Sequence, residues 1–262
     1  MLAARLIACF DVIDGRVTKA RRFQDNTDVG DAPAIASRMY EDGIDELIFY
    51  DILASARRRQ ADLATITAVA QRVFVPLTVG GGVRSLEDMH AVLDAGAEKI
   101  SLDSMAVRDP ELLRQGAEEF GRQCVVQSMQ VKRVPETEAI PSGYSVFVDG
   151  ARVDTGMDAV WWARRGEELG AGEIVVNSID QDGTHAGYDL RVTRMVAEAV
   201  GVPVVASGGA GSVAHVAEAF VEAQASAAIV SSLLYSPRME RNHTVEEIKA
   251  ELNERHNLPV RL

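Results

Sequence analysis

The sequence predicts a (β/α)8 barrel, an α/β fold in which eight parallel strands alternate with eight helices. Three observations support it. Short β-branched segments alternate with longer helical patterns, the two halves of the chain repeat each other, and 262 residues suit one barrel domain over residues 1–262. A doubly wound open sheet is the alternative, but no G-x-G-x-x-G motif follows the first predicted strand.

The predicted elements follow one another in regular alternation. Apolar, β-branched runs predict strands at residues 6–12, 46–51, 75–79, 99–102, 124–129, 173–179, 202–206 and 227–230. Helical patterns predict helices at residues 31–42, 62–72, 85–95, 109–120, 158–169, 190–199, 212–223 and 244–256. In the last helix, Thr244 stands three residues before Glu247, which is the capping-box pattern.

The two halves of the chain resemble each other at one constant offset. Residues 46–49 match residues 173–176, and the same offset relates Pro76 to Pro203. It also places the glycine pair 81–82 on the pair 208–209. Repetition of this kind predicts a barrel built from two related half-barrels.

Each half carries a glycine pair directly after a strand, first Gly81 and Gly82, then Gly208 and Gly209. Such turns let backbone N–H groups approach a phosphate, which the start of the next helix also attracts. Ordinary tight turns are the alternative for either pair alone. Two equivalent pairs favour two phosphate sites, and hence a substrate with a phosphate at each end. Serines that follow the fourth and eighth strands could add donors or cap helices: Ser104, Ser231 and Ser232.

Several carboxylates follow strands on the same predicted face. Asp11 ends the first strand, where burial can raise its pKa into a range useful for acid–base work. A salt-bridged loop residue is an equally good interpretation of Asp11 from its position alone. Asp51, Asp180 and Asp182 are expected to contact substrate hydroxyls or phosphate. No metal-ligand spacing is present, so we expect neither metal nor cofactor.

Two long segments interrupt the alternation, at residues 14–30 and 132–156. Because they follow strands, they are expected on the catalytic face as lids or substrate loops. Residues 144–150 within the second segment are expected to form a small hairpin.

Charge and hydropathy narrow the possible partners. The net charge of −12 argues against nucleic acid or an anionic membrane as the main partner. No apolar run approaches the roughly 20 residues of a membrane-spanning helix. A cytoplasmic location is therefore expected.

Taken together, residues 7–17, 78–83, 177–187 and 206–211 resemble the cyclase subunit of imidazole glycerol phosphate synthase, of histidine biosynthesis. The similarity extends over essentially the whole chain. It implies a barrel lyase that joins ammonia to a bis-phosphorylated aminoimidazole-carboxamide ribulosyl nucleotide. The implied products are imidazole glycerol phosphate and an aminoimidazole carboxamide ribotide. It also implies a heterodimer with a glutaminase (glutamine amidotransferase) subunit, which docks at the N-terminal face and feeds ammonia along the barrel axis.

The resemblance also assigns roles to individual residues. It makes Lys19 a mobile-loop contact to substrate. It assigns phosphate contacts to Gly82 and Ser104 on one side, and to Gly183, Ser207, Gly209 and Ser232 on the other. A ring of charges that gates ammonia corresponds to Arg5, Glu46, Lys99 and Glu173. A purely structural ring of ion pairs is the alternative for these four.

Four positions depart from the pattern of the family, and one of them is Ala20, which follows Lys19 where the family has Gly. Its catalytic pair consists of two aspartates, which correspond here to Asp11 and to Gln130. An amide cannot transfer protons near neutral pH. Asp103 stands where the family has a phosphate-binding Asn, and Asn177 where it usually has Thr.

These departures leave three hypotheses. The cyclase could run with Asp11 and Asp103 as its carboxylates. The chain could instead be a paralogue that uses ammonia on another phosphorylated substrate. It could also be a pseudo-cyclase that binds and activates a glutaminase.

Overall fold

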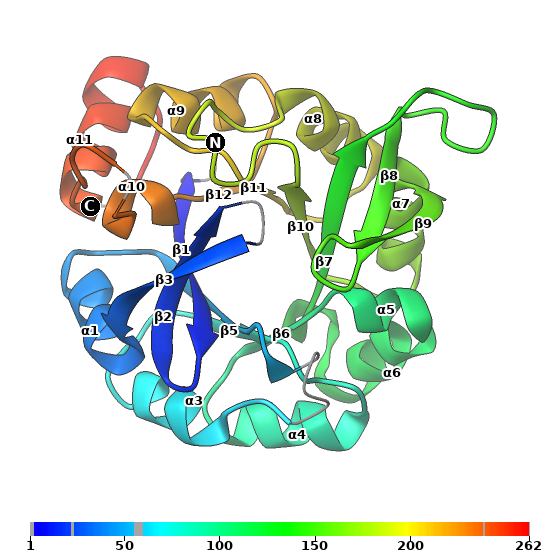
Figure 1. Cartoon of the computed structure of the whole chain (residues 1–262), viewed down its shortest axis with the longest axis horizontal. Helices are drawn as coiled ribbons and strands as arrows, with labels where there is room; N and C mark the ends of the chain where they lie inside the picture. The colour runs from blue at the N-terminus through cyan, green and yellow to red at the C-terminus, as the bar shows by residue number, and fades with distance from the viewer. Residues whose placement is uncertain (1–2, 22–23, 55–59, 238, 262) are drawn as a thin grey trace.

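Parallel strands form a closed ring at the centre of the molecule, and helices surround it (Figure 1). The structure is a computed structural model that describes residues 3–21, 24–54, 60–237 and 239–261. The pairing of the seventh with the tenth strand closes the ring, so the predicted barrel is confirmed and the open sheet is wrong. In order around the ring, the eight strands of this described part are β1 (Arg5–Ile13), β4 (Glu46–Asp51), β5 (Leu77–Gly80), β6 (Lys99–Leu102), β7 (Val125–Arg133), β10 (Glu173–Ser178), β11 (Val204–Ser207) and β12 (Ala227–Ile229).

The eight predicted helices are present on the outside of the ring. They are α1 (Ala32–Glu41), α3 (Leu63–Ala70), α4 (Leu86–Asp94), α6 (Glu111–Phe120), α7 (Ala159–Glu168), α8 (Leu190–Ala199), α9 (Val213–Val221) and α11 (Val245–His256). The predicted capping box of the last helix is confirmed. Among the described residues, three short helices were not predicted: α5 (Ser104–Arg108), η1 (Arg122–Cys124) and α10 (Ser231–Tyr235).

The two halves of the barrel use the same hydrogen bonds at equivalent positions. The N–H of Leu47 donates to the carbonyl oxygen of Pro76, and the N–H of Ile174 donates in the same way to Pro203. Residues that cap helix N-termini repeat at the same offset, in the pairs Asp31 and Asp158, Asp62 and Asp189, and Ser85 and Ser212. These repeated bonds support the predicted origin from two related half-barrels.

The core has two parts, as alternation along barrel strands requires. The larger part lies between the strands and the helices, and includes Phe10, Phe49 and Trp162. The smaller part fills the barrel interior. It consists of Ile7, Ile48, Val126, Val175, Val205, Ala227 and Ile229.

Both long segments after strands form antiparallel hairpins on the barrel. The first contains β2 (Arg16–Arg21), which pairs with β1, and β3 (Gln24–Asp31). The second contains β8 (Tyr144–Val148) and β9 (Val153–Asp158), which extend the sheet from β7. The expected hairpin within residues 144–150 is therefore wrong in extent. That segment is one strand and its turn, because the returning strand begins only at Val153.

A buried ion pair attaches the C-terminal helix to the N-terminal side of the barrel. Lys249 on α11 donates to Asp45 at 2.9 Å and to the carbonyl oxygen of Gly43 at 2.7 Å. The second carboxylate oxygen of Asp45 accepts the N–H of Leu6. Both side chains of the pair are buried, so removal of either would leave an uncompensated charge.

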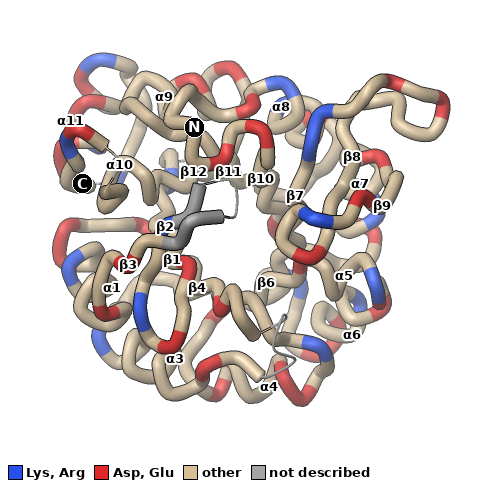
Figure 2. The backbone as a smooth tube through the Cα atoms, viewed as in Figure 1, with Lys and Arg blue, Asp and Glu red and all other residues tan. Residues whose placement is uncertain are grey.

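Charged residues lie mainly on the outer helices and loops (Figure 2). No helix among the described residues is long and apolar enough to cross a membrane.

Candidate active site

The carboxyl ends of the eight strands surround a mouth into which most of the predicted site residues fall. In barrels of this class, this end holds the chemistry. Asp11 enters from β1, Gln130 from β7, Asn177 from β10 and Ser207 from β11. Asp103 directly follows β6. The topology therefore brings together residues that are far apart in sequence.

Asp11 lies where burial works against its charge. Desolvation raises the pKa of Asp11 to about 6, the nearby charge of Lys19 lowers it, and Asp182 raises it. A carboxyl group with such a pKa exchanges protons readily near neutral pH. The strand position that suggested acid–base work from sequence therefore also has the environment for it.

Four side chains on the opposite wall form one hydrogen-bonded chain. The Ser207 hydroxyl donates to Oδ1 of Asn177 at 2.8 Å. Nδ2 of Asn177 donates to Oε1 of Gln130 at 2.6 Å. Nε2 of Gln130 donates to Oδ2 of Asp103 at 3.2 Å. Gln130 thus contacts both Asp103 and Asn177, so hydrogen bonds link three of the positions that depart from the family pattern.

Asp103 is the second carboxyl group with a strongly perturbed environment. Desolvation raises its pKa to about 7, the hydrogen bond from Gln130 lowers it, Asp149 raises it and Arg108 lowers it. Arg108 and Asp149 form an ion pair with each other, so their opposite effects on Asp103 partly cancel. Burial therefore dominates the pKa of this carboxyl group.

The two glycine pairs form close backbone turns in which a residue with a Cβ atom would be strained. Gly81, Gly82, Gly208 and Gly209 all have positive φ angles, between 79° and 108°. A Cβ atom on Gly81 would lie 2.3 Å from the carbonyl oxygen of Asp51, and one on Gly209 would lie 2.1 Å from that of Gly187. The helices that follow, α4 and α9, begin after Ser85 and Ser212. Each pair thus leads into a helix N-terminus, as an anion site requires.

Two of the predicted serines already have protein partners. The Ser231 hydroxyl donates to the carbonyl oxygen of Cys9 and accepts its N–H, so it joins α10 to β1. Ser104 accepts the N–H of Asp149, in the turn between β8 and β9. Ser232 is buried beside Ser231. Of the three, Ser231 has the most evident structural role.

The aspartates predicted to bind substrate have different surroundings. Asp51 is buried, and its carboxylate accepts the backbone N–H groups of Leu53, Ala54 and Asp62. This pattern stabilises the loop after β4. Asp180 accepts the N–H of Arg133. Asp182 and Gly183 lie in the loop after β10, and the charge of Asp182 acts on Asp11.

Lys19 reaches the mouth from the hairpin after β1. Its ammonium group lies 5.9 Å from the ring centre of Tyr235, within the range of a cation–π contact. The same charge lowers the pKa of Asp11. This position is compatible with the predicted contact to substrate.

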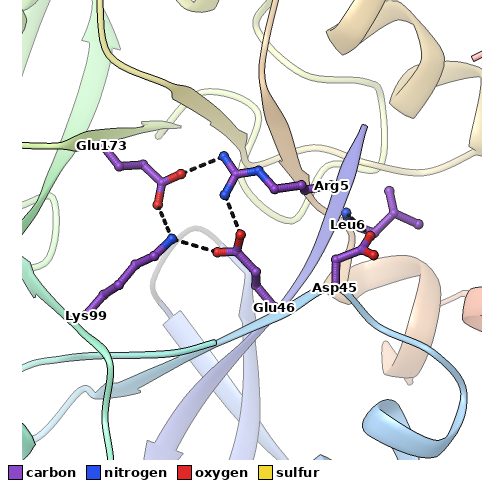
Figure 3. Close-up of polar contacts among 6 residues, drawn as sticks. All are labelled: Arg5, Leu6, Asp45, Glu46, Lys99 and Glu173. Atoms are coloured by element: carbon purple, nitrogen blue, oxygen red, sulfur yellow. Dashed lines mark hydrogen bonds and ion pairs between the residues drawn. The ribbon is translucent and has the colours of Figure 1, made fainter. Parts of the chain in front are cut away.

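At the other end of the barrel, four charged side chains form a closed ring (Figure 3). Each is the first residue of its strand: Arg5, Glu46, Lys99 and Glu173. Arg5 contacts both glutamates, at 2.7 Å for Glu173, and Lys99 contacts Glu46 at 2.9 Å and Glu173 at 3.0 Å. Although burial lowers the pKa of Lys99, the two carboxylates raise it overall. The ring thus lies across the N-terminal end of the barrel axis.

Comparisons with known proteins agree with this geometry. The family model described as "Histidine biosynthesis protein" matches residues 5–240. The chain is 47% identical over 262 residues to imidazole glycerol phosphate synthase subunit HisF of Desulfosudis oleivorans, which covers 100% of this chain and 99% of the relative. It is 50% identical over 235 residues to HisF of Syntrophobacter fumaroxidans, with 90% and 91% covered. The chain belongs to the HisF family.

This HisF-family chain also contains a polar cluster that the sequence analysis did not identify. The hydroxyl group of Tyr50 lies 3.1 Å from that of Ser101 and 3.4 Å from that of Ser128. The tyrosine ring lies against Gly80, where a Cβ atom would collide with it. Tyr50 is the register partner of Asp11 on the neighbouring strand, so it lies at the level of the mouth. Polar residues in otherwise apolar strands were the only sequence signal for the cluster.

Proposed function

We propose that this chain is the cyclase subunit of an imidazole glycerol phosphate synthase. It joins ammonia to a bis-phosphorylated aminoimidazole-carboxamide ribulosyl nucleotide and releases imidazole glycerol phosphate and an aminoimidazole carboxamide ribotide. One observation carries the proposal. The mouth that contains Asp11 is flanked by two equivalent glycine turns, in a chain that matches HisF subunits along its full length.

The two turns fit a substrate with a phosphate at each end. In this proposal, Gly81 and Gly82 bind one phosphate with help from Ser104, and Gly208 and Gly209 bind the other. Because the turns belong to opposite half-barrels, the substrate would lie across the mouth above Asp11. The remaining contacts proposed for substrate and phosphate are Lys19, Asp51, Asp180, Asp182, Gly183, Ser207, Ser231 and Ser232.

The chemistry requires repeated proton transfer. When ammonia condenses with a ketone, nitrogen loses protons and the carbonyl oxygen leaves as water, so each step needs an acid and a base. Asp11 supplies one such group in this proposal. Its pKa of about 6 allows both protonation states to be populated near neutral pH.

A glutaminase subunit is the proposed source of ammonia. The relatives are named as subunits of a synthase. The charged ring lies at the N-terminal face, and Phe74, in the loop before β5, is 79% exposed on that same face. Aromatic residues are enriched in protein–protein interfaces, so an exposed Phe74 on the face that carries the charged ring suits a docking surface. We propose that the partner binds there to form a heterodimer and that ammonia passes the ring into the barrel.

The other two hypotheses have less support. A pseudo-cyclase would not need two glycine turns or an Asp11 with a raised pKa at the mouth. A paralogue with another substrate would share these features, but the matched relatives are HisF subunits at about half identity along the whole chain.

The test is product formation by the purified chain with saturating ammonium and no partner. We expect both products from the wild type and a loss of roughly 10²–10⁴-fold in kcat for Asp11→Asn. Asp94→Asn, on the outer helix α4, removes a carboxylate far from the mouth and serves as the matched control. Equal turnover by Asp11→Asn and the control would exclude the proposed role of Asp11.

The proposed ammonia route is tested separately, with the chain in complex with a glutaminase subunit. Lys99→Met opens two of the ion pairs of the ring. We expect ammonium-dependent turnover to persist while product formed per glutamine hydrolysed changes. If the variant keeps the wild-type ratio, the ring has only a structural role.

A further inference from the structure

We propose that Asp103 is the second proton-transfer group of this active site, and that Gln130 and Asn177 are positioning residues that hold its carboxyl group. This inference rests on the proposed cyclase function. It is carried by the hydrogen-bonded chain that runs across four neighbouring strands of the mouth.

An ionised Asp103 can only accept hydrogen bonds, and this fixes the direction of the hydrogen-bonded chain. Ser207 donates to the amide oxygen of Asn177, so the amide nitrogen of Asn177 must face Gln130. Gln130 accepts that bond with its oxygen, so its nitrogen must face Asp103. While Asp103 is ionised, both amides thus have only one compatible orientation. Asp103 is the acceptor at the end of the chain.

Of these four hydrogen-bonded side chains, only that of Asp103 can titrate near neutral pH. Gln130 and Asn177 carry amides, and Ser207 carries a hydroxyl group without a basic partner in the chain. Asp103 is also accessible, since it is partly exposed where the strands open into the mouth. Its second oxygen, Oδ1, accepts no hydrogen bond from any residue in the described part of the chain. A substrate group could therefore reach it without displacing a protein donor.

The surroundings of Asp103 allow both its protonated and its ionised form to be populated. The charged groups that act on it are Asp149, from the β8–β9 turn, and Arg108, from α5. They pair with each other, which leaves a neutral amide as the direct partner of the carboxyl group. Burial then holds the pKa of Asp103 at about 7, so acid and base forms coexist at neutral pH.

Asp11 and Asp103 stand on β1 and directly after β6, on different sides of the mouth. A substrate between them can receive a proton on one side and lose one on the other. The step is loss of water from the adduct that ammonia forms with the ketone. As the carbon–oxygen bond of this adduct breaks, its electron pair leaves with the hydroxyl oxygen, which takes a proton from the protonated carboxyl group. The opposite carboxylate removes a proton from nitrogen, and the released water and the new carbon–nitrogen double bond complete the balance. Release of the aminoimidazole nitrogen likewise needs one proton.

The first experiment removes the titrating group and then relocates it. Turnover is measured with saturating bis-phosphorylated substrate at a constant concentration of free ammonia. We expect Asp103→Asn to lower kcat by roughly 10²–10⁴-fold with a much smaller change in KM. The double variant Asp103→Asn with Gln130→Asp exchanges amide and carboxylate across the same bond, and should recover most of the loss. Asp94→Asn is the control.

The second experiment perturbs Asp103 through its neighbour and does not depend on the first variant folding. Gln130→Met keeps side-chain length but removes the donor that lowers the pKa of Asp103. The limb of the pH–rate profile assigned to Asp103 should move to higher pH. A merely structural link would lower turnover or stability without moving that limb.

The outcomes separate this inference from the proposed function. Turnover by the wild type with equal kcat in Asp103→Asn would overturn the role of Asp103 and leave the cyclase intact. An unmoved limb in Gln130→Met would overturn the positioning role. Absence of turnover in the wild type, with folded protein and free ammonia present, would instead reject the cyclase itself.

Discussion

Asn177 and Gln130 are hydrogen-bonded at 2.6 Å between neighbouring strands of the barrel. Through this contact Asn177 determines which end of the Gln130 amide faces Asp103. If Asp103 transfers protons as proposed, its pKa therefore depends on a residue that need not touch substrate. The first prediction tests this dependence.

Asn177→Asp should raise the pKa of Asp103. A carboxylate can only accept, so the Gln130 amide would have to turn its nitrogen toward β10 and its oxygen toward Asp103. That arrangement, together with the added negative charge, favours the protonated form of Asp103. We expect the corresponding limb of the pH–rate profile to move up by about one unit. Asn253→Asp, which adds the same charge on the exposed side of α11, should leave the profile in place.

Asp103→Asn should change how stability depends on pH. Burial raises the folded-state pKa of Asp103 to about 7, above its ordinary value of 3.8. The neutral carboxyl group therefore stabilises the fold fully below pH 3.8, and this stabilisation is lost as the pH rises through 7. Asn stays neutral at every pH. The free energy of unfolding of the variant, relative to that of the wild type, should therefore rise by roughly 2 kcal/mol from pH 5 to pH 8. Urea unfolding of both proteins at the two pH values measures this difference, and parallel pH dependence would contradict it.

Lys19→Met should raise the pKa of Asp11. The charge of Lys19 opposes the effects of burial and of Asp182 on this carboxyl group. Without it, the limb of the pH–rate profile that reports Asp11 should shift upward, and KM should increase if Lys19 contacts substrate. Lys19→Arg keeps the charge and should keep the position of the limb. The idea fails if Met and Arg variants give superimposable profiles.

Gly81→Ala should lower the free energy of unfolding by more than the left-handed backbone alone explains. Gly81 and Gly43 have nearly equal φ angles, 85° and 83°, but a Cβ atom has free space only at Gly43. Gly43→Ala should therefore lower the free energy of unfolding by about 1 kcal/mol, which is the cost of the left-handed backbone for a residue with a Cβ atom. At Gly81 the carbonyl oxygen of Asp51 must also move, which should add about 2 kcal/mol or more. Thermal or urea unfolding checks the difference, and equal losses would contradict the close approach.

Much of the fold could be predicted from sequence because local patterns determine it. The ring strands have apolar, β-branched runs, and Asp31, Asp62, Ser85 and Ser212 cap helices at repeated positions. Helices α5 and α10 have only five residues each, too few for a helical period to show. Strands β2 and β3 were missed because their charged residues obscure the alternation that predicts a strand.

The candidate site was predicted only in part, because much of it depends on contacts between strands. Asp11 was expected from its position at the end of a strand. The bond from Gln130 to Asp103 joins β7 to the residue after β6, and neither residue contains a signal of the other's orientation. The same holds for Ser231, whose contact with Cys9 lies far away in sequence. Such relationships follow from closure of the barrel, which no local pattern specifies.

The most direct test of the cyclase assignment is the product ratio of the wild-type chain with ammonium alone. We predict imidazole glycerol phosphate and the aminoimidazole carboxamide ribotide in equal amounts, with rates that follow free ammonia. Thermal stabilisation by the bis-phosphorylated substrate without formation of either product would contradict the assignment, because the chain would then bind this substrate without converting it.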